Sequence, residues 1–173
     1  KNKDTTFESK LDYPASHKTA DTTIVQYFKT TESEEGLIVA RKGDKIGYTN
    51  LNGETVIPFI YDWGAADFSE GLAFVRIKNK IGFIDIKGQE IIPFIYDNAS
   101  NFSEGLAVVA VKDKYGFINK KGEIQIKLEY DLAHEFSCGL AQIKKNNKVG
   151  FIDTTGKIVI PIIYDGAVGF SKK

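Results

Sequence analysis

His134 and Cys138 are the two side chains whose types and spacing most resemble a nucleophile and its base. A cysteine thiolate is a strong nucleophile, and a neighbouring histidine can take its proton. The sequence repeats itself, however, and the aligned copies place His134 opposite Ser100, and Cys138 opposite Glu70 and Glu104. Both residues stand at positions that vary between copies, and no third group is evident to orient them. We therefore expect a chain with no catalytic residue.

Aspartates recur once in each copy, directly after a tyrosine: Asp62, Asp97, Asp131 and Asp165. If the copies close into a ring, four carboxylates converge and can bind a cation. The alternative is that each carboxylate caps the turn after its tyrosine by bonding nearby backbone N–H groups, which explains every copy at once. We favour the turn, and expect no metal site and no cofactor. We also expect a role in turns for the Asp or Asn that recurs at one aligned position, at Asn50, Asp85, Asn119 and Asp153.

Glutamates precede the glycine that opens each copy at Glu35, Glu70 and Glu104. We expect them to pair with lysines of a neighbouring copy. Exposed ion pairs of this kind contribute about 0–1 kcal/mol each.

The segment Trp63–Asp67 has the strongest claim to bind a ligand, because it contains the only tryptophan. It also lies where one copy is a single residue longer than the others. Repeat arrays place equivalent loops along one surface, and binding commonly uses the loop positions that vary. We expect Trp63 and Asp67 to contact a ligand. The alternative is an indole that fills the gap opened by the insertion.

A tandem repeat of about 34 residues places all of these side chains. The letters IPFIYD occur at 57–62 and again at 92–97, and FSEGLA occurs at 68–73 and 102–107. The glycine columns are Gly47, Gly82, Gly116, Gly150 and Gly53, Gly88, Gly122, Gly156. The aromatic columns are Tyr61, Tyr96, Tyr130, Tyr164 and Phe68, Phe102, Phe136, Phe170.

The composition of each copy, in which Val, Ile, Phe and Tyr dominate, predicts three strands. The intervals between glycines are too short for the helices of a tetratricopeptide array. In the second copy we expect strands at Gly71–Ile77, Lys80–Asp85 and Glu90–Tyr96. Lys78-Asn79 suits a two-residue hairpin turn, and residues 85–88 suit a type I turn that ends on a left-handed glycine.

These strands carry apolar side chains on both faces, which predicts an all-β tandem array of three-stranded antiparallel units, each packed between its neighbours. Tyr and Phe of the connection should fill the joint between units. Pro93 predicts an edge or a bulge in the third strand, where the third copy has Lys127. We favour an open solenoid-like stack, with a closed small β-propeller as the alternative.

The array divides the chain into three parts. A polar N-terminal segment covers residues 1–21, and a degenerate half-repeat covers 22–35, in which Tyr27 stands before Gly36 as Tyr96 stands before Gly105. Four repeats follow within 36–173, at about 36–70, 71–104, 105–138 and 139–171.

The composition excludes several classes of function. Lysine plus arginine number 23 and aspartate plus glutamate number 23, so the chain lacks the basic excess of a nucleic-acid binder. It also lacks a stretch of about 18 apolar residues that could form a membrane-spanning helix. The single cysteine permits neither an intrachain disulfide nor a thiolate cluster. The polar Lys1–Thr6 resembles the linker after a removed secretion signal, and methionine is absent, so we expect a processed or trimmed product.

The letters KYGFIN at 114–119, KKG at 120–122 and IPFIYDNASNFSEGLAVV at 92–109 resemble the bacterial WG repeat family, over about residues 36–171. The tryptophan of the family motif is replaced here by Ile46, Ile81, Tyr115 and Val149, which keeps an apolar packing group. The resemblance implies an all-β repeat protein that is exported or attached to the cell surface, without a catalytic residue or an agreed ligand. Derivation from a lipoprotein is one route to such a location, and a cytoplasmic location is the alternative.

The function expected from these observations is a non-enzymatic module that binds or scaffolds a protein partner. The alternative is a carbohydrate-binding module at the cell surface, with Trp63 and the tyrosines as stacking platforms for a glycan.

Overall fold

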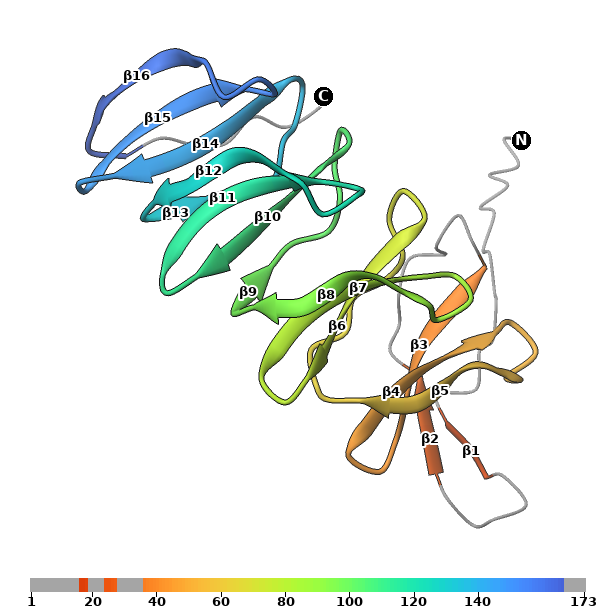
Figure 1. Ribbon diagram of the computed structural model, residues 1–173. Coiled ribbons are helices and arrows are strands. Elements are labelled where there is room, and N and C mark those ends of the chain that lie inside the picture. The colour runs from red at the N-terminus through yellow and green to blue at the C-terminus, as the bar shows by residue number, and fades with distance from the viewer. Residues whose placement is uncertain (1–15, 19–23, 28–35, 167–173) are drawn as a thin grey trace, which may run out of the picture.

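The computed structural model describes residues 16–18, 24–27 and 36–166, and these residues form strands and loops only. Figure 1 shows four antiparallel sheets that follow one another along an elongated stack, from the N-terminal sheet to the C-terminal one. No sheet closes into a barrel, and the first and last sheets lie at opposite ends. The open stack is confirmed, and the closed propeller is not the fold.

Each sheet has its strands in chain order, and each of the four repeats supplies three of them. The first sheet contains β1 (Ser16–Lys18), β2 (Ile24–Tyr27), β3 (Leu37–Lys42), β4 (Lys45–Asn50) and β5 (Thr55–Tyr61). The second contains β6 (Leu72–Ile77), β7 (Lys80–Asp85) and β8 (Glu90–Tyr96). The third contains β9 (Asn98–Ala99), β10 (Leu106–Val111), β11 (Lys114–Asn119) and β12 (Ile124–Tyr130). The fourth contains β13 (Leu132–Ala133), β14 (Leu140–Lys145), β15 (Lys148–Asp153) and β16 (Ile158–Tyr164).

The N-terminal predictions are only partly covered by the structure. Lys1–Thr6, Glu35 and Phe170 lie outside the described residues, as do most of the polar segment and of the half-repeat. Tyr27 lies opposite Ala40 on the first strand of its repeat, whereas Tyr96 lies opposite Ile81 on a second strand. The equivalence of the two tyrosines, suggested by their spacing before a glycine, therefore does not extend to strand pairing.

Both predicted hairpin turns are confirmed. Lys78 and Asn79 have φ values of 49° and 65°, as a two-residue turn with two left-handed positions requires. In the second turn, Gly88 has a φ of 77° and its N–H donates to the carbonyl of Asp85 at 2.9 Å. The Asp85 carboxylate accepts from the N–H of Lys87 at 2.9 Å and of Gln89 at 2.8 Å, so this column does serve the turn.

The hydrophobic cores lie between sheets. The buried aromatic side chains of each joint come from the sheet before it and its connection, and the following sheet contributes buried aliphatic side chains. The first core contains Leu37, Val39, Ile46, Tyr48, Ile57, Tyr61, Phe68, Ala73, Val75 and Ile84. The second contains Leu72, Ile81, Phe83, Ile92, Tyr96, Phe102, Ala107, Val109 and Ile118. The third contains Leu106, Val108, Phe117, Ile126, Tyr130, Ala133, Phe136, Ala141, Ile143 and Ile152.

Tyrosine and phenylalanine fill the joints as predicted. At the second joint, Tyr96 is 4% exposed and Phe102 is 2% exposed, with the Phe102 ring centre 5.1 Å from that of Phe83. Ile81, which replaces the tryptophan of the repeat motif, is 1% exposed in the same core. An aliphatic side chain therefore keeps the packing role of this position. Tyr164 differs from its three counterparts, because 48% of its surface is exposed.

The third strand of each repeat bends across the glycine of the second strand. A Cβ on Gly82 would lie 2.7 Å from the carbonyl oxygen of Ile92 and 3.0 Å from the nitrogen of Phe94, which is too close for any side chain. The pairing register shifts at the same point. This bend turns Ile91 and Ile95 out of the joints, so the prediction that third strands are buried on both faces is wrong. The first and second strands do lie between neighbouring sheets, and β8 with Pro93 is an edge strand, as predicted.

Substitution of Gly82 by alanine should lower the free energy of unfolding by about 2–3 kcal/mol, because the methyl group must push two backbone segments apart. Chemical denaturation measures the change. Gly166→Ala is the matched control, since a Cβ there would meet no atom within 4 Å. Equal stability of the two variants would contradict this account of the bend.

Substitution of Phe102 by alanine should cost about 3–5 kcal/mol, because it empties the centre of the second joint. Ile95→Ala, at a position that is 51% exposed, should change stability by less than about 0.5 kcal/mol. Thermal and urea unfolding of both variants would show the difference, and a small effect at Phe102 would mean that the joint is not the main core.

Candidate functional site

The Phe-Ser-Glu-Gly segment of one repeat binds the same segment of the next. The hydroxyls of Ser69 and Ser103 donate to the carbonyls of Phe102 and Phe136, each at 2.8 Å. The Glu70 carboxylate accepts from the N–H of Gly105 at 3.2 Å, and Glu104 accepts from Gly139 at 2.9 Å. These bonds form a ladder that fixes the spacing of successive sheets, so the segment has a structural role.

Glu70 also forms an ion pair with Lys120 at 3.0 Å. A lysine partner was predicted for this residue, but Lys120 lies in the third repeat, two repeats after that of Glu70, and not in the neighbouring one. Partial burial opposes ionisation of Glu70, but the hydrogen bonds from Lys120 and from the Gly105 N–H outweigh it and lower the pKa. Glu104 keeps the backbone bond. It forms no ion pair with any residue that the structure describes.

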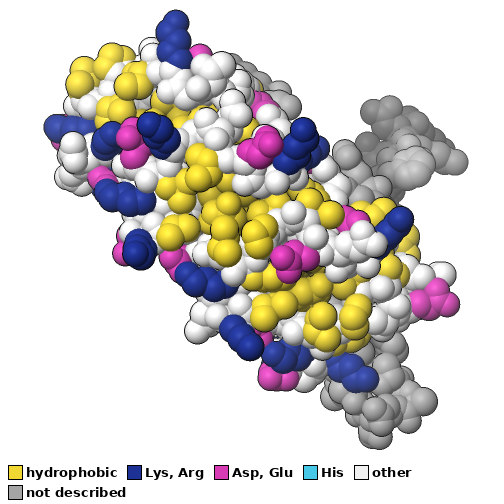
Figure 2. Space-filling view, in the orientation of Figure 1, with side chains coloured by type: hydrophobic (Ala, Val, Ile, Leu, Met, Phe, Trp, Pro, Cys, Tyr) yellow, Lys and Arg dark blue, Asp and Glu magenta, His cyan; other side chains and the backbone are white. Residues whose placement is uncertain are grey.

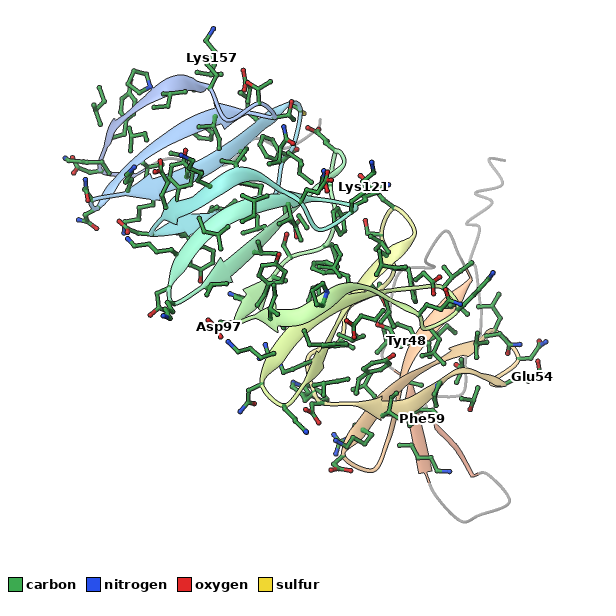
Figure 3. The ribbon with its side chains drawn as sticks, viewed as in Figure 1. Tyr48, Glu54, Phe59, Asp97, Lys121 and Lys157 are labelled. Carbon is green, nitrogen blue, oxygen red and sulfur yellow. The ribbon has the colours of Figure 1, made fainter. Side chains whose placement is uncertain are left out.

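The aspartate after each joint tyrosine connects two sheets. One oxygen of Asp97 binds the Lys80 ammonium group of the preceding sheet, and the other accepts the N–H of Lys112, in the hairpin of the next sheet, at 2.9 Å. Figure 3 labels Asp97 at this boundary. The prediction that these carboxylates cap the turn directly after the tyrosine is therefore wrong, because their backbone partners lie 15 or 16 residues further along the chain. Asp62 and Asp131 make the equivalent contacts.

These contacts lower the pKa of Asp62, Asp97 and Asp131, first through the lysine and then through the backbone N–H. The four aspartates are spread along the stack, one per repeat. Within residues 36–166, no group of three His, Cys, Asp or Glu side chains gathers as metal ligands would.

His134 and Cys138 occupy the variable positions that the alignment gives them. The N–H of His134 donates to Gln142 as the N–H of Ser100 donates to Val108. Cys138 has a φ of 55°, like Glu70 and Glu104 at 52° and 56°. Both side chains are exposed, and no interaction between them occurs in the described part of the chain.

An open groove of about 760 Å³ follows the connections that precede the third and fourth sheets, and His134 is one of its lining residues. Two of its serine hydroxyls are already used. Ser103 donates to Phe136, and Ser100 donates to Asn101 and accepts from Val108. The groove thus contains hydroxyls with a structural role beside a solvent-exposed imidazole.

Trp63 lies at the only joint with an extra residue. In the third and fourth sheets the connection forms the two-residue strands β9 and β13, whereas residues 63–65 form no strand. Gly64 has a φ of 103°, and Trp63 is 62% exposed with Arg41 at 5.7 Å from the ring centre. The indole therefore projects to the surface, as ligand contact requires, and does not fill a gap in the core.

Asp67, the other predicted ligand residue, is half-buried beside Tyr48. Burial, together with the negative charge of Asp67, raises the pKa of Tyr48 well above its usual range. The Tyr48 hydroxyl donates to the carbonyl of Ala66 at 2.7 Å, and Figure 3 shows its ring between the first two sheets. These contacts give the segment around Asp67 a defined role in holding the irregular joint.

A row of exposed apolar side chains runs along the third strands, and sequence analysis missed it. We define this outward row as Val56, Pro58, Ile60, Ile91, Pro93, Ile95, Val159, Pro161 and Ile163. Its valine and isoleucine members are 41–62% exposed. In the third sheet the equivalent residues are Gln125, Lys127 and Glu129. Figure 2 shows hydrophobic atoms over β5 and β8, charged atoms near β12, and hydrophobic atoms again at β16.

The signal for this row was present in the sequence, since every second residue of the third strand is apolar in three copies and polar in one. The bend across the glycine decides that these residues point outward, and the sequence pattern did not indicate this bend. The residues described contain no helix with the length and hydrophobicity that a membrane span requires.

The contacts of Asp97 with Lys80 and with the N–H of Lys112 should make the free energy of unfolding depend on pH in the acid range. Because its pKa is lowered in the folded state, its contribution is complete above the pKa of an unfolded aspartate, about 3.9, and is lost as the pH falls through the folded value. The stability difference between the wild type and Asp97→Asn should therefore be constant from neutral pH to about pH 5 and shrink below about pH 4. Urea unfolding across this range, with Lys80→Gln and the double variant to isolate the pair, provides the measurement. A stability difference that persists unchanged below pH 4 would contradict a stabilising role of the ionised Asp97 carboxylate.

The repeat pattern matches a known family. The family model described as WG containing repeat matches residues 46–80, 81–115, 115–148 and 150–173, which together cover more than half of the chain. No curated protein matches the chain. The matches begin at or near the position of the motif tryptophan, on β4, β7, β11 and β15. The matched ranges include the side chains that fill the joints and the glycine over which each third strand bends. The chain therefore belongs to the WG containing repeat family.

Proposed function

We propose that this repeat module acts by binding a protein partner, without chemistry of its own, and that the outward row is its contact surface. The observation that carries the proposal is the row itself. Six valine and isoleucine side chains, each 41% exposed or more, lie on three sheets of one stack. Exposed apolar patches rimmed by polar groups are typical of protein interaction sites, and the row is apolar on the first, second and fourth sheets and polar on the third. An exported or cell-surface location forms part of the proposal.

The third repeat supports this interpretation, because Gln125, Lys127 and Glu129 show that the fold does not need apolar residues at these positions. Burial cannot explain the apolar side chains in the other repeats, since their surfaces face solvent. Pro58, Pro93 and Pro161 lie in edge strands, where proline prevents the addition of another strand. The row therefore suits a partner that packs against side chains, without extending a sheet.

Carbohydrate binding is the second candidate, and the exposure of Trp63 favours it. Glycan platforms rely on exposed aromatic rings, whereas Tyr61, Tyr96 and Tyr130 are each 5% exposed or less, and Tyr164, which is 48% exposed, lies on the last sheet, far from Trp63 on the first repeat. The outward row contains valine, isoleucine and proline and no aromatic ring. These features favour a protein partner.

The chain offers its own matched variant for the test. Ile91→Gln, Pro93→Lys and Ile95→Glu together copy the third repeat into the second, and the reverse set, Gln125→Ile, Lys127→Pro and Glu129→Ile, extends the row. Wild type and both variants serve as bait in affinity capture from cell extract, with melting temperatures as the folding control. We expect proteins that the wild type retains, that the first variant loses and that the reverse variant retains at least as strongly.

Identical capture by the wild type and the first variant would contradict the outward row as the contact surface. A glycan array with wild type and Trp63→Ala tests the alternative. Binding of a sugar that depends on Trp63, with no partner captured through the row, would favour the carbohydrate-binding function.

A further inference from the structure

The two arginines of the chain both lie at the irregular joint, Arg41 beside Trp63 and Arg76 beside the following residue, Gly64. The guanidinium carbon of Arg41 is 5.7 Å from the centre of the Trp63 ring. The Nε atom of Arg76 is 3.5 Å from the place that a Cβ would take on Gly64, the next residue after Trp63. The other 21 basic residues are lysines, so the irregular joint gathers a side-chain type that the rest of the molecule lacks.

Arg41 and Arg76 occupy equivalent positions, five residues after the glycine that opens each repeat. The same position holds Ala110 in the third repeat and Lys144 in the fourth. Neither the fold nor the joints therefore require arginine there.

Among the described residues, each guanidinium group donates to one backbone carbonyl, which leaves most of its five N–H groups for an external acceptor. The Nε of Arg41 donates to the Gly43 carbonyl at 2.6 Å, and one terminal nitrogen of Arg76 lies 3.5 Å from the Asn79 carbonyl. All six ion pairs among the described residues use lysine. Asp62, whose pKa is lowered chiefly by Lys45 and slightly by the charge of Arg76, is bound by Lys45 and by the N–H of Lys78.

A guanidinium group presents N–H donors in a planar fork that fits a carboxylate with two parallel hydrogen bonds. Tryptophan and arginine are also the side chains that most often dominate the energy of protein interfaces. Because the Trp63 ring is 62% exposed, the site is an open platform that suits a segment of a larger partner. The outward row ends on β5 at Ile60, three residues before Trp63, or about 10 Å of extended chain.

We propose that Trp63, Arg41 and Arg76 form a binding site for the carboxylate of an acidic segment in the protein partner. This inference rests on the proposed function and names the chemistry of the partner at one end of the outward row. The carboxylate takes the guanidinium N–H groups, and apolar parts of the same segment pack on the indole.

Trp63 provides the readout, because it is the only tryptophan and its emission reports on this site alone. The full chain is titrated with poly-L-glutamate, and we expect a saturable change in emission that weakens as salt is added. Arg41→Lys and Arg76→Lys keep the charge but remove the planar fork, and each should weaken binding about tenfold. Arg76→Ala, which copies the third repeat, should weaken it at least as much. Lys144→Ala is the matched control at the equivalent position of the fourth repeat and should bind like wild type.

Three results would overturn the inference. One is the absence of a saturable change with poly-L-glutamate. Another is equal weakening by Lys144→Ala and by the arginine variants, which would indicate attraction to any positive charge. The third is a response to polygalacturonate without one to poly-L-glutamate, which would assign the carboxylate to a glycan.

The variant that copies the third repeat into the second separates this inference from the proposed function. It changes β8 and leaves Trp63 and both arginines in place, so it should lose partner capture and keep the emission response. Partner capture that persists in both arginine variants, with no response to poly-L-glutamate, would overturn the carboxylate site alone. A normal response without any captured partner would overturn the proposed function, and with it the assignment of the carboxylate to a protein.

Discussion

Tyr96 and Phe102 close the joint between the second and third sheets, and the same two side-chain types close the other two joints. A three-stranded sheet cannot bury both of its faces alone, so each sheet is stable only against its neighbours. Every joint sets the buried aromatic side chains of one sheet against buried aliphatic ones of the next, such as Ala107 and Val109. The repetition of this contact fixes the direction of the stack and the places at which loops and third strands reach the surface.

The polar contacts between sheets fix geometry more than they add energy. Asp97 binds Lys80 of one sheet and the hairpin of the next, while Ser69 and Glu70 bind backbone groups about one repeat further along. The charged groups of these ion pairs and hydrogen bonds are partly exposed, and exposed ion pairs stabilise proteins weakly. These contacts restrict how neighbouring sheets are placed, because each hydrogen bond can form at only one spacing and one rotation of the two sheets. They therefore keep the apolar joints in register along a stack that has no ring closure to do so.

Much of this fold could be predicted from the sequence, because strand formers, turn residues and spacing all agreed in every copy. Lys80–Asp85 and Glu90–Tyr96 are strands with the predicted bounds, and the left-handed Gly88 ends the predicted turn. What failed were statements that depend on how one strand lies on another or one repeat on the next. The partner of Asp97 lies in the next hairpin, and the outward face of β8 depends on the bend over Gly82. The first contact joins two repeats, and the second depends on the exact path of one strand over another, so the pattern of residue types alone does not reveal either.

The irregular joint keeps the Tyr and Phe packing of the other joints but differs from them in its connection. It has one more residue, it lacks the short strand that pairs with β10 and β14 elsewhere, and it exposes a tryptophan to solvent. Each departure gives up backbone pairing or apolar burial, and the third and fourth sheets show that the fold has a regular solution at the same place. Local departures that bring no structural gain are typical of functional positions. The exposed outward row obeys the same logic, since Gln125, Lys127 and Glu129 show the regular polar solution for that face. In the first repeat the last residue of the row, Ile60, lies three residues before Trp63, and a single partner that contacts both accounts for their being close together.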